Sequence, residues 1–132
     1  MKIFVDTSAF LAVLDSDDLN HPRADQIWQN ILTQGDILVS TNYVIVETIS
    51  LIQRRFGLPS AREFHEDVVP LLQLEWIDPA VHLTAVQLVF LVNQRPLNLV
   101  DCVSFTMMRR LHISTAFAFD EHFQRQGFTC LR

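Results

Sequence analysis

The chain has 132 residues, 49% of them hydrophobic, and a formal net charge of −5. This length suits one hydrophobic core, so we expect a single domain over residues 1–132. The negative charge argues against binding nucleic acid through a broadly basic surface, and no apolar run approaches the ~20 residues of a membrane span. Asp6 also interrupts the apolar start before any signal cleavage site, so we expect a cytoplasmic protein.

The first predicted element is a strand from Lys2 to Val5, which ends at Asp6. The stretch IFVDTSAF has two interpretations. Aspartate is a favourable helix N-cap, so a strand passing into a helix through Asp6 needs no further explanation. Alternatively, Asp6 is the first of several carboxylates that bind a metal ion at one edge of a sheet. The rest of the chain is needed to choose between them.

Further strands alternate with helical segments along the chain. The predicted strands are Ile37 to Ser40, Leu74 to Ile77, Thr115 to Phe119 and Phe128 to Leu131. Helix starts are indicated near Thr41 or Asn42, at Ser60 with Glu63 in capping-box spacing, at Asp78 before Pro79, and at Asn98. This alternation predicts a mostly parallel sheet covered on both faces, in which ligands gather at the carboxyl ends of the strands.

Three more acids accompany Asp6 in this pattern. Asp120 follows a predicted strand, whereas Glu47 and Asp101 share helical faces with apolar residues. Taken singly, each acid has an ordinary explanation as a cap, a solvent-exposed side chain or a complement to a helix dipole. Taken together, they are expected at the carboxyl edge of one sheet. Clustered carboxylates without cysteine favour Mg²⁺ or Mn²⁺ over Zn²⁺.

Four segments that contain these acids occur in order: VDTSAF, TNYVIVETISLI, NLVDCVSFTMMRRL and TAFAFDEHFQRQGF. They resemble the four acidic motifs of PIN-domain nucleases, especially the VapC-type ribonuclease toxins of bacterial toxin-antitoxin pairs. The resemblance extends over essentially the whole chain. It implies an α/β fold, a three-layer α/β/α sandwich around a mostly parallel sheet of about five strands. It also implies that Asp6, Glu47, Asp101 and Asp120 are the catalytic, metal-binding acids.

The same resemblance implies an endoribonuclease that uses Mg²⁺ or Mn²⁺ to hydrolyse RNA and is restrained by an antitoxin protein. Thr7 or Ser8, together with Asn42, match polar positions that flank the site in this family. His122 could contact substrate beside Asp120, although we favour a turn or capping role. The alternatives are a catalytically silent PIN-like binding module and a PIN ribonuclease that processes RNA without an antitoxin. Retention of all four acids favours an active enzyme.

Three other features have an ordinary interpretation beside a functional one. The run LVFLV, from Leu88 to Val92, is apolar on every side of a helix and is either buried or an oligomer interface; the resemblance favours a homodimer.

Cys102 and Cys130 lack the number and spacing of a disulfide framework or zinc site, so we expect small buried side chains. Four arginines either line an RNA path or, as we favour, occupy solvated helix ends: Arg54, Arg55, Arg109 and Arg110.

Overall fold

The computed structural model describes residues 1–132 and has a five-stranded sheet in which every neighbouring pair of strands is parallel. The strands are β1 (Lys2–Val5), β2 (Ile37–Thr41), β3 (Leu72–Glu75), β4 (Thr115–Phe117) and β5 (Thr129–Leu131). Their order across the sheet is β3-β2-β1-β4-β5. The predicted parallel α/β sheet of about five strands is therefore confirmed.

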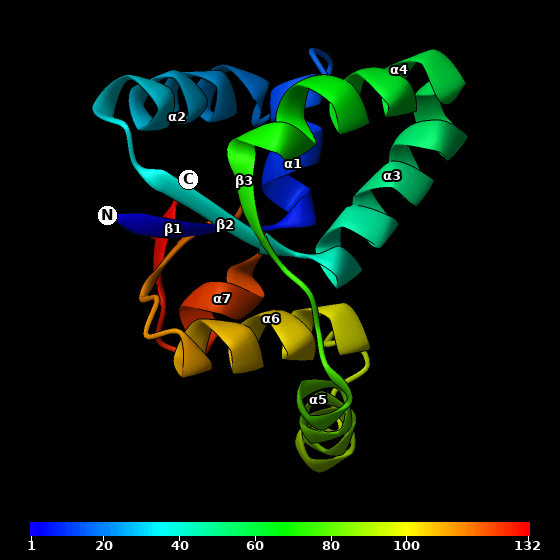
Figure 1. Ribbon diagram of the computed structural model, residues 1–132, viewed down its shortest axis with the longest axis vertical. Helices are drawn as coiled ribbons and strands as arrows, with labels where there is room; N and C mark the ends of the chain where they lie inside the picture. Colours follow the sequence, from blue (N-terminus) through cyan, green and yellow to red (C-terminus); the bar gives the residue numbers. More distant parts are fainter.

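Helices cover both faces of this sheet. They are α1 (Thr7–Leu14), α2 (His21–Gln34), α3 (Asn42–Phe56), α4 (Leu58–Glu63), α5 (Pro79–Val92), α6 (Leu99–Arg110) and α7 (Glu121–Arg125), with a π-helical turn over Phe64–Val68 and a 3-10 turn over Val69–Leu71. Figure 1 shows α1 to α4 on one side of the sheet and α5 to α7 on the other, which gives the expected three layers. None of the helices is long and apolar enough to span a membrane.

The chain changes direction across the sheet at the central strand, β1. Strands β2 and β3 follow on one side of β1, and β4 and β5 lie on the other. In an open parallel sheet, the crevice beyond the carboxyl ends of the strands at such a reversal is the preferred ligand site. Asp6 directly follows β1, and Asp120 follows β4 after two intervening residues, so both acids lie at this reversal.

The predicted third strand was placed two residues too late. The strand pairs with β2 from Leu72 onward and ends at Glu75, opposite Thr41. Beyond Thr41 the neighbouring chain becomes α3, so no strand remains for Ile77 to pair with. The backbone N–H of Ile77 instead donates to Oδ1 of Asn42 at 2.8 Å. The start of α3 therefore limits the length of β3.

The predicted capping box at Ser60 and Glu63 is wrong. Helix α4 begins at Leu58 with Gly57 as its N-cap, so Ser60 lies inside the first turn. Gly57 has a φ of 93°, a conformation that glycine adopts readily, and Pro59 is well tolerated in a first helical turn. These two residues set the boundary between α3 and α4, and Ser60 contributes no cap.

The helix starts predicted near Thr41, at Asp78 and at Asn98 are confirmed. The side chain of Thr41 accepts from the N–H of Val44, that of Asp78 from Val81, and that of Asn98 from Asp101. The last two strands are shorter than predicted: β4 ends at Phe117 and β5 begins at Thr129.

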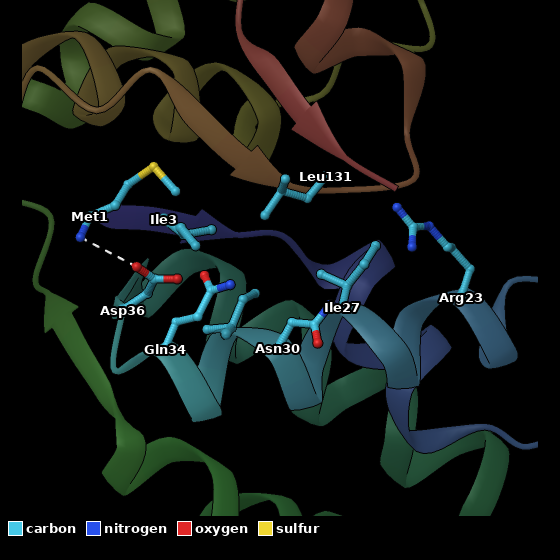
Figure 2. Close-up of a pocket in the computed structure, with 9 residues that line it drawn as sticks. Met1, Ile3, Arg23, Ile27, Asn30, Gln34, Asp36 and Leu131 are labelled. Atoms are coloured by element: carbon cyan, nitrogen blue, oxygen red, sulfur yellow. Dashed lines mark ion pairs between the residues drawn. The ribbon is translucent and has the colours of Figure 1, made fainter.

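A cavity of about 190 Å³ lies between α2 and the sheet (Figure 2). Its lining includes Met1 and Asp36, whose ammonium and carboxylate groups lie 3.3 Å apart. Both residues immediately precede the first residues of β1 and β2, so they mark the amino ends of these strands. This cavity is therefore on the opposite edge of the sheet from Asp6 and Asp120.

Candidate active site

Asp6 caps a helix and also leaves one carboxylate oxygen free at the edge of the sheet. Its Oδ2 accepts from the backbone N–H of Ser8 at 3.1 Å, which makes Asp6 the N-cap of α1. The same oxygen accepts from the Ser8 hydroxyl at 2.7 Å. The residue is only 4% exposed. Because both bonds use Oδ2, Oδ1 has no partner within the protein and remains accessible.

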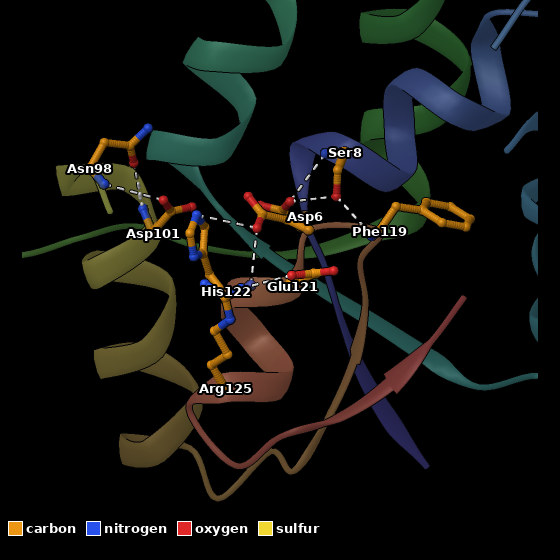
Figure 3. Close-up of polar contacts among 9 residues, drawn as sticks. Asp6, Ser8, Asn98, Asp101, Phe119, Glu121, His122 and Arg125 are labelled. Atoms are coloured by element: carbon orange, nitrogen blue, oxygen red, sulfur yellow. Dashed lines mark hydrogen bonds and ion pairs between the residues drawn. The ribbon is translucent and has the colours of Figure 1, made fainter. Parts of the chain in front are cut away.

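Ser8 connects the end of β1 to the segment that leads to Asp120. Its hydroxyl donates to Asp6 and its oxygen accepts from the backbone N–H of Phe119 at 3.0 Å (Figure 3). This bond explains why Phe119 lies outside β4, although the sequence predicted a strand to that residue. Thr7, the other candidate beside Asp6, accepts from the buried hydroxyl of Thr48 at 3.1 Å and so connects α1 to α3.

Asp101 lies in the first turn of α6 and completes a capping box with Asn98. The N–H of Asp101 donates to Asn98 Oδ1 at 2.9 Å, and the N–H of Asn98 donates to Asp101 Oδ2 at 3.2 Å. Asp101 is 7% exposed, as expected for an acid that shares a helical face with apolar residues. Its second oxygen, Oδ1, has no hydrogen-bond partner in the protein and is therefore accessible.

Asp120 is the N-cap of α7. Its Oδ1 accepts from the backbone N–H of His122 at 3.0 Å. Oδ2 has no partner in the protein. Asp6, Asp101 and Asp120 thus share one arrangement, in which the helix cap binds one carboxylate oxygen and leaves the other accessible.

Glu47 lies on α3 and is partly exposed. It lines an open cavity of about 280 Å³ together with Asn42, Tyr43, Val46 and Val100. Asn42, predicted to be a polar residue flanking the site, uses its Oδ1 to accept from Ile77 and so anchors the segment after β3. The cavity extends the acidic site along a mostly apolar surface.

The pKa values of two of the acids, Asp6 and Asp101, are raised by burial and by the charges of neighbouring acids. Burial raises the pKa of Asp6 from 3.8 to about 6, the hydrogen bonds from Ser8 oppose the rise, and the charges of Asp120 and Glu47 add to it. Burial also raises the pKa of Asp101 from 3.8 to about 7, with further contributions from the other three acids. Such mutual repulsion is relieved when a cation binds among the carboxylates.

The side chain of His122 enters the same cluster. Its Nε2 lies 3.4 Å from Oδ1 of Asp120. Ligand atoms of Asp101, Asp120 and His122 all lie within 4.8 Å of one another, and Figure 3 shows the imidazole between the labelled Asp101 and Asp6. The sequence interpretation of His122 as a turn residue accounts for its backbone, which binds Asp120, but it missed the position of the ring. The D-x-H spacing across a helix start was the available signal.

The four arginines make no contact with the acids. Arg109 donates to the side chain of Gln126 at 2.9 Å, and Arg110 pairs with Asp78 at 3.6 Å. Both lie in the last turn of α6, at the opposite end of that helix from Asp101. Arg54 and Arg55 lie exposed in the last turn of α3, as the helix-end interpretation predicts.

The cysteines differ in burial. Cys102 is fully buried, and this burial raises the pKa of its thiol, which keeps the thiol neutral. Cys130 is only partly buried, so the expected burial is correct for Cys102 alone.

Comparisons with known proteins place the chain beside nucleases. Residues 3–129 match the PIN domain family. The chain is 29% identical over 131 residues to the 23S rRNA-specific endonuclease VapC20 from two strains of Mycobacterium tuberculosis, with 98% of each chain covered. The crystal structure of that VapC20, described as a sarcin-ricin loop cleaving toxin, matches with a TM-score of 0.82 over 96% of each chain. FitAcB from Neisseria gonorrhoeae, 11% identical, shares the fold with a TM-score of 0.72 over 100% of this chain and 97% of the other.

Proposed function

The chain belongs to the PIN domain family, and from this premise we propose that it is a Mg²⁺- or Mn²⁺-dependent endoribonuclease that acts as the toxin of a toxin-antitoxin pair. PIN domains are nucleases, so the reaction is hydrolysis of a phosphodiester bond. The observation that carries the proposal is the convergence of Asp6, Glu47, Asp101 and Asp120 on one edge of the sheet, with the pKa raised at two of them.

The donor set fits a divalent cation. Asp6, Asp101 and Asp120 each present one accessible carboxylate oxygen, and the other oxygen is held by a helix N-terminus. Fixed carboxylate oxygens are the ligands that Mg²⁺ and Mn²⁺ prefer. When bound, such an ion lowers the pKa of a water molecule and neutralises charge that develops on phosphate oxygens. Glu47 is the fourth acid of the proposed metal set.

The hydrogen bonds around these acids keep them in position. Ser8 holds Asp6 through two bonds and holds the segment before Asp120 through the Phe119 N–H. Asn98 holds Asp101 through the capping box. Because each constraint comes from a helix start or a strand end, the carboxylates are oriented before substrate arrives, and less ordering is required during the reaction.

The cavity beside Glu47 supports a single-stranded RNA substrate. Tyr43, Val46 and Val100 give it apolar walls, and the Tyr43 hydroxyl is hydrogen-bonded to His82 on α5. Proteins recognise unpaired RNA bases by stacking them on aromatic rings and packing them against apolar side chains. We place the nucleotide next to the scissile phosphate in this cavity.

An exposed apolar surface on α5 supports the proposed homodimer. Phe90 and Leu91 are 77% and 81% exposed, whereas Leu88, Val89 and Val92 are partly buried, so the run LVFLV is exposed on one side only. Large apolar side chains that gather on one exposed helix mark interaction sites. As part of the proposal, we expect the toxin to act on RNA in the cytoplasm and to be restrained there by an antitoxin protein.

The proposal is tested by incubating the full chain with RNA in Mg²⁺, Mn²⁺ or EDTA. The substrates are an unstructured RNA and a hairpin with the sarcin-ricin loop sequence of 23S rRNA, the target in the name of the similar VapC20. We expect cleavage with either ion, none in EDTA, and products with a 5′-phosphate. Asp6→Asn should be inactive, whereas Asp25→Asn, at an exposed acid on α2, should match the parent. Full activity in EDTA would rule out the metal mechanism, and no cleavage of any RNA would favour a silent module.

A further inference from the structure

His122 has an unusual environment for a histidine near a helix start. Its side chain is only 14% exposed and neither ring nitrogen makes a hydrogen bond within the protein, so the nitrogens are accessible at the site. The contact between Nε2 and Asp120 Oδ1 measures 3.4 Å, which is beyond the usual range of about 2.7 to 3.2 Å for an N–H···O bond. The ring is therefore placed against two carboxylates without being satisfied by either.

The spacing of the three side chains suits a shared cation. Ligands about 2.1 Å from an octahedral ion lie roughly 3.0 Å apart when adjacent and about 4.2 Å apart when opposite. One atom from each of Asp101, Asp120 and His122 falls within 4.8 Å of the others, so small side-chain movements bring all three to an ion. The N–H groups of Asn98 and His122 bind one oxygen of each acid and leave Oδ1 of Asp101 and Oδ2 of Asp120 free, whereas Nε2 of His122 lies nearest to the cap-bound Oδ1 of Asp120.

We propose that the imidazole of His122 is a direct ligand of the cation held by Asp101 and Asp120, and that it makes this site prefer Mn²⁺ over Mg²⁺. The inference rests on the proposed function only in assuming that the acids bind a divalent ion. Imidazole nitrogen suits transition-metal ions, whereas Mg²⁺ prefers oxygen ligands alone. A site of four carboxylates without this nitrogen offers only oxygen ligands, which do not by themselves favour Mn²⁺ over Mg²⁺.

Two other roles for His122 predict different behaviour. A histidine that merely orients Asp120 supports binding of Mg²⁺ and Mn²⁺ equally, because both ions bind the same carboxylate. A histidine that only neutralises the acids competes with any cation, so its removal strengthens the binding of both ions. Direct ligation alone makes the effect depend on the ion.

The test measures metal binding by the full chain without RNA. Isothermal titration gives the dissociation constants of Mg²⁺ and Mn²⁺ for the parent, His122→Ala, His122→Gln and a control, His65→Ala, at an exposed histidine outside the site. We expect the Mn²⁺ preference to fall by at least about tenfold in both His122 variants and to stay unchanged in the control. Pulsed electron paramagnetic resonance of the Mn²⁺-loaded parent should detect coupling to an imidazole nitrogen, which His122→Ala should remove.

Each contrary result overturns the proposal. An equal loss of affinity for both ions would assign His122 to the orientation of Asp120, and a gain for both would assign it to charge neutralisation. Absence of nitrogen coupling in the parent would exclude ligation directly. Should His122→Ala fold poorly, His122→Gln and the parent spectrum still decide the question. The ribonuclease proposal fails separately if the protein binds the ions as predicted but does not cleave RNA.

Discussion

Replacing Asp101 by Asn is expected to stabilise the metal-free protein while it abolishes activity. The carboxyl group of Asp101 is buried, and its pKa rises from 3.8 to about 7 on folding. Such an acid costs no stability when the pH lies below its pKa in the unfolded chain. The cost grows as the pH rises from that value toward the pKa of the acid in the folded protein. At about 1.36 kcal/mol per pKa unit, the folded state loses about 4 kcal/mol at pH 7 but only about 2 kcal/mol at pH 5.

The net effect of Asp101→Asn is smaller than this loss. The bond from the Asn98 N–H to Asp101 Oδ2 is weakened in the variant, at a cost of about 1 kcal/mol. A net gain of about 3 kcal/mol at pH 7 remains, or roughly 6 to 12 °C in melting temperature at the about 2 to 4 °C per kcal/mol of a domain near this size. At pH 5 the gain should fall to about 1 kcal/mol.

Thermal melts in EDTA at pH 5 and pH 7 measure this difference, and melts with added Mg²⁺ measure the metal response. The parent should gain about 2.7 kcal/mol at a hundredfold excess of Mg²⁺ over its dissociation constant, and the variant much less. Asp78→Asn is the matched control, because Asp78 likewise accepts a backbone N–H at a helix start but its side chain is half exposed. A lower melting temperature of Asp101→Asn at pH 7 in EDTA, or equal metal responses, would refute the reasoning.

Three further predictions follow from the same contacts. Ser8→Ala removes the hydroxyl hydrogen bond that lowers the pKa of Asp6 and the acceptor of the Phe119 N–H, so a carboxyl titration by NMR should show a higher Asp6 pKa, and thermal melts should show a loss of about 1 to 3 kcal/mol in stability. The apparent Mg²⁺ affinity, measured by titration calorimetry, should rise with pH between about 6 and 7 and then level off, because Asp6 and Asp101 must lose their protons to bind the ion; a flat profile would contradict the raised pKa values. Phe90→Glu should yield a monomer in sedimentation without lowering the stability of the isolated chain, whereas Leu19→Glu, at an exposed leucine outside α5, should leave the dimer intact; a monomeric parent would refute the dimer.

Local sequence patterns were sufficient for most element starts. Asp78 before Pro79 and Asn98 before an apolar run both begin helices, because their side chains accept from N–H groups of the following turn. The capping-box pattern failed at Ser60, because the backbone at Gly57 and Pro59 had already started the helix. The helix start set by the backbone at Gly57 lies three residues before the cap expected at Ser60. The backbone conformations of Gly57 and Pro59 determined where the helix begins, and the side chain of Ser60 did not.

The ends of the strands depended on contacts between distant parts of the chain. Ile77 follows β3 without pairing because β2 gives way to α3 at Asn42, and Phe119 leaves β4 to bind Ser8. Neither event has a signal in the residues next to the strand, since both partners lie far away in the sequence. Strand boundaries were therefore the least accurate part of the sequence interpretation.

The sequence by itself determined the alternation of strands and helices and the place of four acids at strand ends and helix starts, because periodicity and capping act over a few residues. It left each acid with a choice between an ordinary structural role and a metal ligand. Only the tertiary structure shows that capping leaves room for metal binding: Asp6, Asp101 and Asp120 each use one oxygen at a helix cap and leave the other accessible. It also decided the positions of His122 and Ser8, because the distances from one side chain to acids on other elements depend on how the whole sheet and its helices pack.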